Sequence, residues 1–244
     1  MTLASDSASS DSTAVSNFWA ALSEPARAEI CRRGRTVRYR QGEVLISEGD
    51  CTDDVVVLMR GWVKVVTRDA DGYESLLAAR GAGDLVGEMA ALAPIARTAE
   101  VQAITDLTVI RLPGSEFTRM LDANPEVSMV LLRVLVARLR HADQWRARCG
   151  SLTVSQRLAV LLLELLTQYE IAPRPSGERS LPFSQEELAG FVAASRKSVV
   201  RALGQLRSQG LVRTGRGAIN VLRPAALHRT VAEHLPAPPE YRGV

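Results

Sequence analysis

The sequence predicts an α+β protein in which a jelly roll of short antiparallel strands is followed by one long helix, then by shorter helices and a β-hairpin. Three observations support this fold class. Short β-branched runs alternate with glycine and acidic turns in the first half, an apolar stripe of helical spacing follows, and capped helices precede a strand–glycine–strand segment near the end. Because strands repeat every second residue and helices about every 3.6, these patterns predict separate parts of the chain.

The composition is that of a globular chain able to bury a core. The chain has 244 residues, 46% of them hydrophobic, and a formal net charge of +3, which permits a polyanionic partner without requiring one. Its three cysteines are far apart, with no CxxC pair or histidine cluster, so we expect reduced thiols and no metal site. Residues 1–17 lack a secretory signal, and no apolar run reaches membrane-spanning length. We expect a disordered tail over 1–17 and a soluble, cytoplasmic protein.

The first domain, residues 18–122, begins with a short helix and continues as strands. The segment from Phe18 to Gly34 has helical character, and the runs from Thr36 to Pro113 are short and β-branched. Glycine adopts the positive φ angles that tight turns need. The glycines of the predicted turns are Gly42, Gly49, Gly61, Gly72 and Gly83. This spacing is typical of an antiparallel roll.

Residues 123–150 are predicted to form one long dimerisation helix. Asn124 is a suitable N-cap, and Pro125 suits the first helical position. A heptad seam consists of Met129, Leu132, Val136 and Leu139, and an adjacent face carries Leu131, Leu135 and Arg138. Two faces favour a helix that packs on its own domain and on a second copy of the chain. The alternative is a helix that packs on its own domain alone.

Residues 151–228 are predicted to form a helix-turn-helix followed by a β-hairpin wing, with a tail over 229–244. Ser184 and Glu187 form a capping box, and Ser195 is an N-cap for the next helix. The second helix is expected to bury Val199, Ala202, Leu203 and Leu206 and to expose Arg196, Lys197, Val200 and Arg201. Gly210 is expected to end this helix, and Arg213 and Arg216 lie on the predicted wing.

This basic helix face favours DNA binding. Its cations lie at the N-terminal end of the helix, where the helix dipole disfavours them unless a negative partner is present. The major groove is such a partner, and a helix-turn-helix places the start of its second helix there. The alternative is an ordinary solvated helix surface.

The stretch GDLVGEMAALAPIARTAEV, Gly83 to Val101, combines apolar residues with one acid, Glu88, and one base, Arg97. A guanidinium suits a phosphate, and a carboxylate suits a ribose hydroxyl. Backbone N–H groups at the start of a short helix add a further device for binding anions. These features predict a pocket for a nucleotide with one compact phosphate, and the alternative is a structural ion pair between Glu88 and Arg97.

This stretch resembles the phosphate-binding cassette of cyclic nucleotide-binding domains. With the long helix and the SRKSVVRAL helix, the chain from about Phe18 to Leu227 resembles the Crp/Fnr family of bacterial transcription regulators. The resemblance implies that Gly87 and Glu88 hold the ribose 2′-hydroxyl and that Met89 and Ala90 offer backbone contacts. It also implies that Arg97 and Thr98 bind the cyclic phosphate.

The chain departs from the cyclic AMP-binding members where they read adenine. Their Thr-Ser pair on the long helix is replaced by Ala142 and Asp143. The Asp143 carboxylate can accept from the amino group of adenine or, more completely, from N1–H and the N2 amino group of guanine, unless it is merely solvated. Thr98 also resembles the cassettes of cyclic GMP-selective domains. We expect cyclic AMP slightly before cyclic GMP as the allosteric ligand, and a silent pocket is the alternative.

The second departure is in the residues that read DNA. Family members that recognise TGTGA-type half-sites use an Arg-Glu pair followed by an arginine, and the matching residues here are Arg196, Lys197 and Arg201. Lysine cannot accept a hydrogen bond from cytosine, so we expect an altered half-site. The expected DNA contacts are Ser195, Arg196, Lys197, Ser198, Val200, Arg201, Arg213 and Arg216.

The sequence therefore predicts a homodimeric, ligand-controlled transcription regulator that binds a palindromic site in double-stranded DNA. The loop from Ala172 to Arg179 is a candidate contact for RNA polymerase. An enzyme is disfavoured, because no nucleophile, second carboxylate or metal set accompanies Glu88 and Arg97. His141, on the long helix, is expected to be a packing or surface residue rather than a metal ligand. The remaining alternative is a cyclic nucleotide-responsive regulatory module that does not bind DNA.

Overall fold

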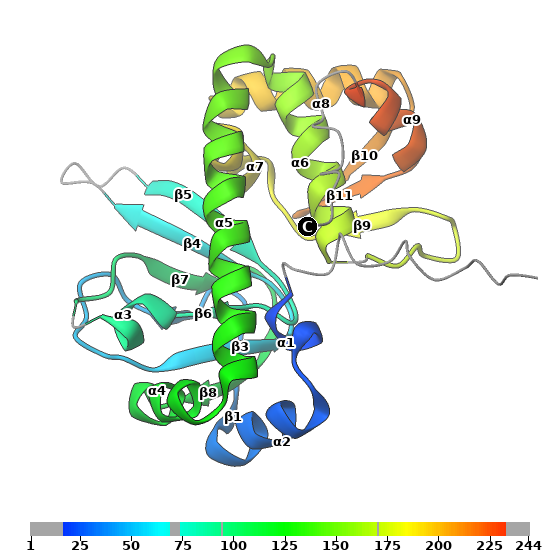
Figure 1. Ribbon diagram of the computed structural model, residues 1–244. Coiled ribbons are helices and arrows are strands. Elements are labelled where there is room, and N and C mark those ends of the chain that lie inside the picture. The colour runs from blue at the N-terminus through cyan, green and yellow to red at the C-terminus, as the bar shows by residue number, and fades with distance from the viewer. Residues whose placement is uncertain (1–16, 69–73, 94, 170, 233–244) are drawn as a thin grey trace, which may run out of the picture.

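The computed structural model describes residues 17–68, 74–93, 95–169 and 171–232, and it has the predicted α+β fold. A β-roll and a helix-rich C-terminal half lie along one long helix, α5, which runs past both (Figure 1). Most of the predicted N-terminal tail, the turn glycine Gly72 and the end of the C-terminal tail lie outside the described residues.

The N-terminal segment forms two helices where we predicted one, α1 (Phe18–Ala21) and α2 (Glu24–Arg33). Leu22 ends α1 in an extended conformation, and α2 has a proline in its first turn. The ring of Pro25 would clash with the carbonyl group four residues earlier in a continuous helix, so the chain breaks and restarts. Phe18 is fully buried and fixes α1 on the roll.

Two four-stranded antiparallel sheets form the roll. One sheet has the order β1 (Arg35–Tyr39), β8 (Leu107–Leu112), β3 (Val55–Arg60), β6 (Leu85–Val86). The other has the order β2 (Val44–Ile46), β7 (Glu100–Ala103), β4 (Val63–Arg68), β5 (Glu74–Arg80). Residues from both sheets, including Leu45, Val56, Leu58, Val63 and Val101, form one buried cluster, which confirms the predicted roll.

One turn of the roll shows why glycine is needed there. Gly61 connects β3 to β4 with φ of 93°, and a Cβ atom at this position would lie 2.4 Å from the carbonyl oxygen of Asp106. Only glycine meets both constraints. Short helices α3 (Glu88–Leu92) and α4 (Gly114–Ala123) complete this half of the chain.

The long helix α5 spans Pro125–Ser151 and has two apolar faces, as predicted. Leu131 is buried and Leu135 is partly buried, and both pack on the roll with Phe117 and Met120. The four seam residues are 49–61% exposed: Met129, Leu132, Val136 and Leu139. Within the described chain, therefore, the inner face of α5 packs on the roll, whereas the seam residues remain exposed.

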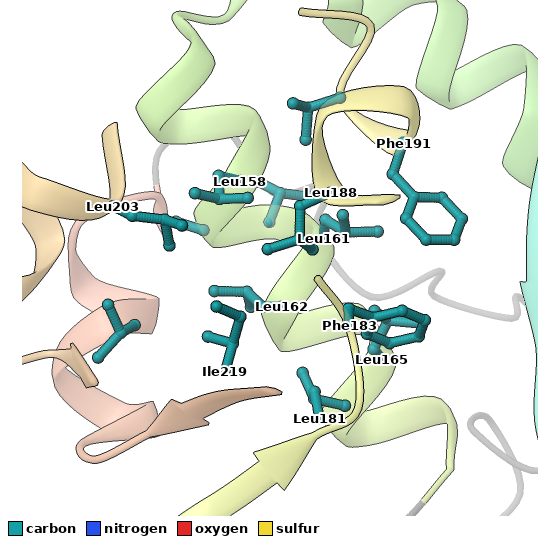
Figure 2. Packing of buried hydrophobic residues seen from close by; sticks show 14 of the residues in the cluster. Leu158, Leu161, Leu162, Leu165, Leu181, Phe183, Leu188, Phe191, Leu203 and Ile219 are labelled. Atoms are coloured by element: carbon teal, nitrogen blue, oxygen red, sulfur yellow. The ribbon is translucent and has the colours of Figure 1, made fainter. Parts of the chain in front are cut away.

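The C-terminal half packs around the apolar helix α6 (Val154–Gln168). It also contains α7 (Gln185–Phe191), α8 (Arg196–Ser208) and α9 (Pro224–Arg229), with a sheet of order β10 (Val212–Gly215), β11 (Ala218–Val221), β9 (Arg179–Leu181). Figure 2 shows leucines of α6 meeting Leu181, Leu188, Leu203 and Ile219 in one core. Strand β9 and helix α9 were not predicted, and Val231, beyond the boundary that we drew at 228, is buried.

The two halves share buried apolar contacts. Ala79 and Ile104 of the roll belong to the same cluster as the α6 core. The Trp62 ring lies 4.4 Å from the Tyr169 ring and 5.3 Å from the Phe183 ring, between centroids. These aromatic contacts fix the C-terminal half against the roll. No described helix is both long and apolar enough to cross a membrane.

Candidate functional site

The candidate site is built around a glycine at the start of α3. Gly87 follows β6 with φ of 87° and is the N-cap of α3. A Cβ atom here would lie 2.7 Å from the Asp54 carbonyl oxygen and 2.9 Å from Nη1 of Arg97. The chain can therefore make this turn, with Arg97 against it, only with glycine.

Arg97 is buried, with 4% of its surface exposed. Its Nε donates to Thr52 Oγ1 at 3.1 Å, Nη1 to the Gly87 carbonyl at 2.9 Å, and Nη2 to the Asp54 carbonyl at 2.8 Å. All three acceptors are neutral. Burial lowers the pKa of Arg97, and the charges of nearby aspartates, chiefly Asp54, oppose this effect.

The Arg97 guanidinium retains capacity for an anion. Three of its five N–H groups are used by these bonds, which leaves one on each terminal nitrogen. Two parallel N–H groups on one guanidinium match the spacing of two phosphate or carboxylate oxygens. A buried cation that hydrogen-bonds only neutral groups therefore lies at a site suited to a compact anion.

Glu88 is buried at 6% exposure, but its partner is not Arg97. The Glu88 carboxylate accepts from Nη1 of Arg138, on α5, at 2.8 Å. The ion pair between Glu88 and Arg97 that the structural alternative required does not form among the described residues. The acid and the base thus both adjoin Gly87 but have separate partners.

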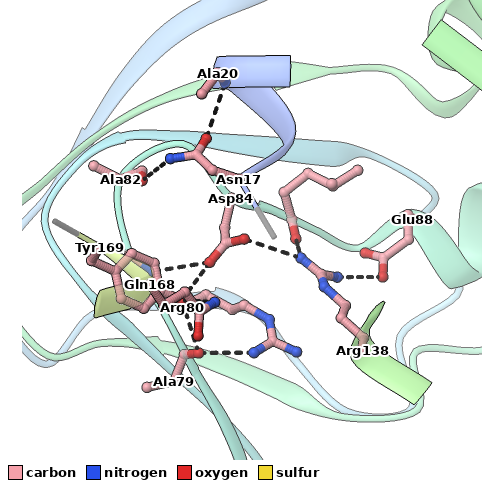
Figure 3. A network of polar contacts seen from close by, with 12 residues as sticks. Asn17, Ala20, Ala79, Arg80, Ala82, Asp84, Glu88, Arg138, Gln168 and Tyr169 are labelled. Carbon is pink, nitrogen blue, oxygen red and sulfur yellow. Dashed lines mark hydrogen bonds and ion pairs between the residues drawn. The ribbon is translucent and has the colours of Figure 1, made fainter. Parts of the chain in front are cut away.

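A polar network connects Glu88 to the C-terminal half (Figure 3). Arg138 Nη2 donates to the Leu85 carbonyl at 2.7 Å and lies 3.6 Å from Asp84 Oδ1. The Tyr169 hydroxyl donates to Asp84 Oδ2 at 2.5 Å, and Asp84 is 1% exposed. Asp84 Oδ1 has no hydrogen bond among the described residues. Burial, followed by the Asp84 charge, raises the pKa of Tyr169 well above 10.0.

Sequence reasoning missed the roles of Asp84 and Tyr169 in this network. Arg138 carried a visible signal, because it is a charged residue on the inner, otherwise apolar face of the long helix. Asp84 and Tyr169 are 85 positions apart, and no local pattern connects them.

The other predicted ligand residues are more exposed. Met89 and Thr98 are exposed, 4.0 Å apart between Sδ and Oγ1, and Ala90 is half-buried. Ala142 and Asp143 are exposed on α5, and Asp143 pairs with Arg146 at 2.8 Å. Within the described chain, Asp143 makes no hydrogen bond or ion pair with the cassette.

The predicted helix-turn-helix is formed by α7 and α8. The Ser184–Glu187 capping box is present, and Ser195 Oγ accepts from the Ser198 amide at 3.2 Å. The four predicted outer residues, Arg196, Lys197, Val200 and Arg201, are all exposed, and the four predicted core residues are all buried. The predicted exposed and buried faces of α8 are therefore confirmed.

The wing residues have partners of their own. Arg213 on β10 forms an ion pair with Glu178, beside the start of β9. Arg216, in the wing turn, lines a groove of about 1110 Å³ between the wing and the roll. Arg38, Arg40 and Arg60 of the roll line the same groove, so basic side chains continue beyond the wing.

The described residues contain no group of three His, Cys, Asp or Glu side chains arranged to hold a metal. His141 hydrogen-bonds Glu164 at 3.1 Å and stacks on Trp145, as a packing residue would.

Two family models match the chain. A cyclic nucleotide-binding domain matches residues 36–124, and a Crp-like helix-turn-helix domain matches residues 156–230. The first includes the whole cassette, and the second includes the helix-turn-helix and the wing.

Curated relatives match most of the chain. A CRP-like cAMP-activated global transcriptional regulator of Mycobacterium tuberculosis is 30% identical, over 77% of this chain and 84% of its own length. The cyclic AMP receptor protein of Thermus thermophilus is 31% identical, over 80% of this chain and 86% of its own length.

Solved structures agree with these relatives. A CRP/FNR-family transcriptional regulator of Thermus thermophilus has a TM-score of 0.67 and 27% identity, covering 82% of this chain and 98% of its own. FixK2 of Bradyrhizobium japonicum has a TM-score of 0.70 and 24% identity, covering 80% and 96%, and supports the fold alone.

Proposed function

The chain belongs to the Crp/Fnr family of transcription regulators, and from that premise we propose that it is a homodimeric activator or repressor whose binding to palindromic DNA is controlled by a cyclic purine nucleotide. The observation on which this proposal chiefly rests is the pair of buried charges that adjoin Gly87. Glu88 and Arg97 are each bound to other protein groups and not to each other.

The ligand would lie with its cyclic phosphate on Arg97 and Thr98 and its ribose on Gly87 and Glu88. Arg97 has two N–H groups left for phosphate oxygens after its three protein bonds. The Glu88 carboxylate has further lone pairs for a ribose hydroxyl after accepting from Arg138. The backbone of Met89 and Ala90, in the first turn of α3, adds N–H groups near the phosphate.

The base of the nucleotide is the least constrained part of the ligand. The names of the curated relatives favour cyclic AMP. Asp143 and Thr98 favour cyclic GMP as the second candidate, because a carboxylate accepts from both N1–H and the N2 amino group of guanine. Since Asp143 and Ala142 are exposed on α5, they would reach a base only when dimerisation or ligand binding brings it to them.

The dimer would form through the uncovered seam of α5. Four large apolar side chains at heptad spacing, each about half exposed, are costly on an isolated chain. A second copy of α5 would bury them. Because Arg138 and the seam share this helix, ligand contacts at Glu88 would favour one arrangement of the two subunits over another.

The exposed start of α8 would enter the major groove. Arg196, Lys197 and Arg201 project away from the protein core, and Arg196 lies 3.5 Å from exposed Glu186. Lys197 cannot accept from a cytosine amino group, so we propose a half-site that differs from TGTGA. Ser195 and Ser198 at the helix start, and Arg213 and Arg216 on the wing, would contact the backbone. Residues 172–177 are exposed and would offer RNA polymerase a surface.

The test is titration of the full chain with cyclic AMP and cyclic GMP by calorimetry, for the natural protein and for Arg97→Ala. Arg119→Ala, an exposed arginine on α4, is the matched control. We expect micromolar or tighter binding that Arg97→Ala abolishes and Arg119→Ala preserves. Absence of binding to either nucleotide would favour a silent pocket.

DNA binding needs a separate measurement. Selection from random duplexes, with and without nucleotide, should recover a palindrome that is not TGTGA–TCACA. Recovery of no duplex at all would favour a regulatory module that does not bind DNA.

A further inference from the structure

Arg80, the last residue of β5, points into the roll beside the candidate site. It is paired in register with Val63 of β4, which is fully buried in the roll cluster, and paired residues of neighbouring strands project to the same face. The preceding residue, Ala79, lies in the core of the C-terminal half, on the opposite face. Figure 3 shows the Arg80 guanidinium next to that of Arg138.

Within the described chain, the Arg80 guanidinium has one hydrogen bond to the protein. Its Nη1 donates to the carbonyl of its neighbour Ala79 at 2.9 Å, and no carboxylate hydrogen-bonds it among the described residues. Burial is the main cause that lowers the pKa of Arg80, and the repulsion of Arg138 adds to it. Asp84 and Glu88 attract it through their charge. A guanidinium held in this way has four N–H groups available, since it has five in all.

Pairwise contacts connect the charged groups of the site in series. Arg97 contacts Gly87, Glu88 binds Arg138, and the Arg80 guanidinium lies next to that of Arg138 in Figure 3. For a nucleotide with its phosphate on Arg97 and its ribose on Glu88, we place the base next in this series, beside Arg138 and Arg80. This step rests on the proposed function.

We infer that Arg80 is a specificity-determining residue that donates to O6 and N7 of a guanine-type base. Guanine presents two acceptors on this edge, which the arginine fork matches with two N–H groups. Adenine presents the N7 acceptor next to the N6 amino group, a donor that opposes one of those N–H groups. Family membership alone favours cyclic AMP, whereas Arg80 favours a purine with a carbonyl at position 6.

The test combines three nucleotides with substitutions of Arg80. Cyclic IMP has the same O6, N7 and N1–H groups as cyclic GMP but lacks the N2 amino group, so the difference between these two nucleotides reports on the N2 contact alone. The contribution of the O6 and N7 edge is then measured by the Arg80 variants. Calorimetry on the full chain should show that cyclic GMP and cyclic IMP each bind about tenfold or more tightly than cyclic AMP. Arg80→Leu should remove most of that difference by weakening cyclic GMP and cyclic IMP while leaving cyclic AMP within about twofold.

Arg80→Lys and Arg119→Ala complete the set of variants. Lysine keeps the charge but lacks the fork, so Arg80→Lys should also lose the preference, and it tests the inference if Arg80→Leu does not fold. Arg119→Ala should change no affinity. Equal weakening of all three nucleotides in both Arg80 variants would assign Arg80 a structural role and overturn the inference, as would an unchanged preference. Failure of the proposed function is distinct, because the natural protein would then bind none of the three.

Discussion

Replacing Tyr169 with phenylalanine tests the polar network between the two halves of the protein. The change removes one hydroxyl group and keeps the ring, which packs at 4.4 Å from Trp62. The lost bond is the 2.5 Å donation to Asp84, a carboxylate with 1% of its surface exposed. What remains for Asp84 is the Gly81 amide at 3.3 Å and Arg138 at 3.6 Å.

The expected cost is large for so small a change. A hydrogen bond to a charged group contributes about 1.5–3 kcal/mol to stability. Because Asp84 stays buried and keeps only weaker partners, the stability lost with this bond should lie within that range. We therefore expect Tyr169→Phe to lose about 2 kcal/mol of stability. In a chain of this length, that corresponds to a decrease in Tm of roughly 4–8 °C. Tyr169→Ala, which also removes the ring, should lose about 3–5 kcal/mol.

The pH dependence gives the same prediction a second measurement. The pKa of Tyr169 is raised well above 10.0 in the folded protein, so folding favours the protonated hydroxyl. The corresponding stability is fully present below about pH 10, the pKa of an unfolded tyrosine, and is lost as pH rises further toward the folded pKa. Tyr169→Phe should lack this alkaline loss.

The assay is thermal unfolding followed by circular dichroism at neutral pH and at intervals from about pH 9 to 11, on either side of the pKa of an unfolded tyrosine. Tyr39→Phe is a matched control, because Tyr39 accepts from Arg111 at 2.9 Å and is outside the network. A Tm within about 1 °C of the natural protein for Tyr169→Phe would refute the reasoning. So would an unchanged alkaline profile.

The remaining predictions concern the seam, the cassette and the reading residues. Leu132→Glu with Leu139→Glu should yield monomers by light scattering and abolish binding to palindromic DNA, because charges would replace the exposed apolar seam; a dimer of unchanged mass would contradict the proposed interface. Gly87→Ala should cost at least about 1–2 kcal/mol of stability through its φ of 87° and eliminate nucleotide binding, whereas Gly204→Ala on α8, with open space at Cβ, should not destabilise the fold. Lys197→Glu should move the selected half-site toward TGTGA by restoring an acceptor for cytosine, and an identical selected sequence would exclude that contact.

The sequence was sufficient wherever short-range rules decide the structure. The positive φ angles of Gly42 and Gly49, the capping box of Ser184 and Glu187, and the two faces of α5 all depend on residues within one or two turns of each other. The burial of Glu88 and Arg97 was also predictable, because burial of the apolar residues on both sides carries these two charged residues into the interior.

Tertiary structure decided which partners those charges acquire. Glu88 binds Arg138, 50 positions away, rather than Arg97, and Asp84 meets Tyr169 from the other half of the chain. Strand β9 forms because β11 offers it an edge, and α9, which follows the hairpin in the chain, packs on α6. A hydrogen bond between distant segments leaves no periodicity in the sequence. Its partners are chosen by the packing that brings them together, and the cost of burying a charge without a partner then holds them in place.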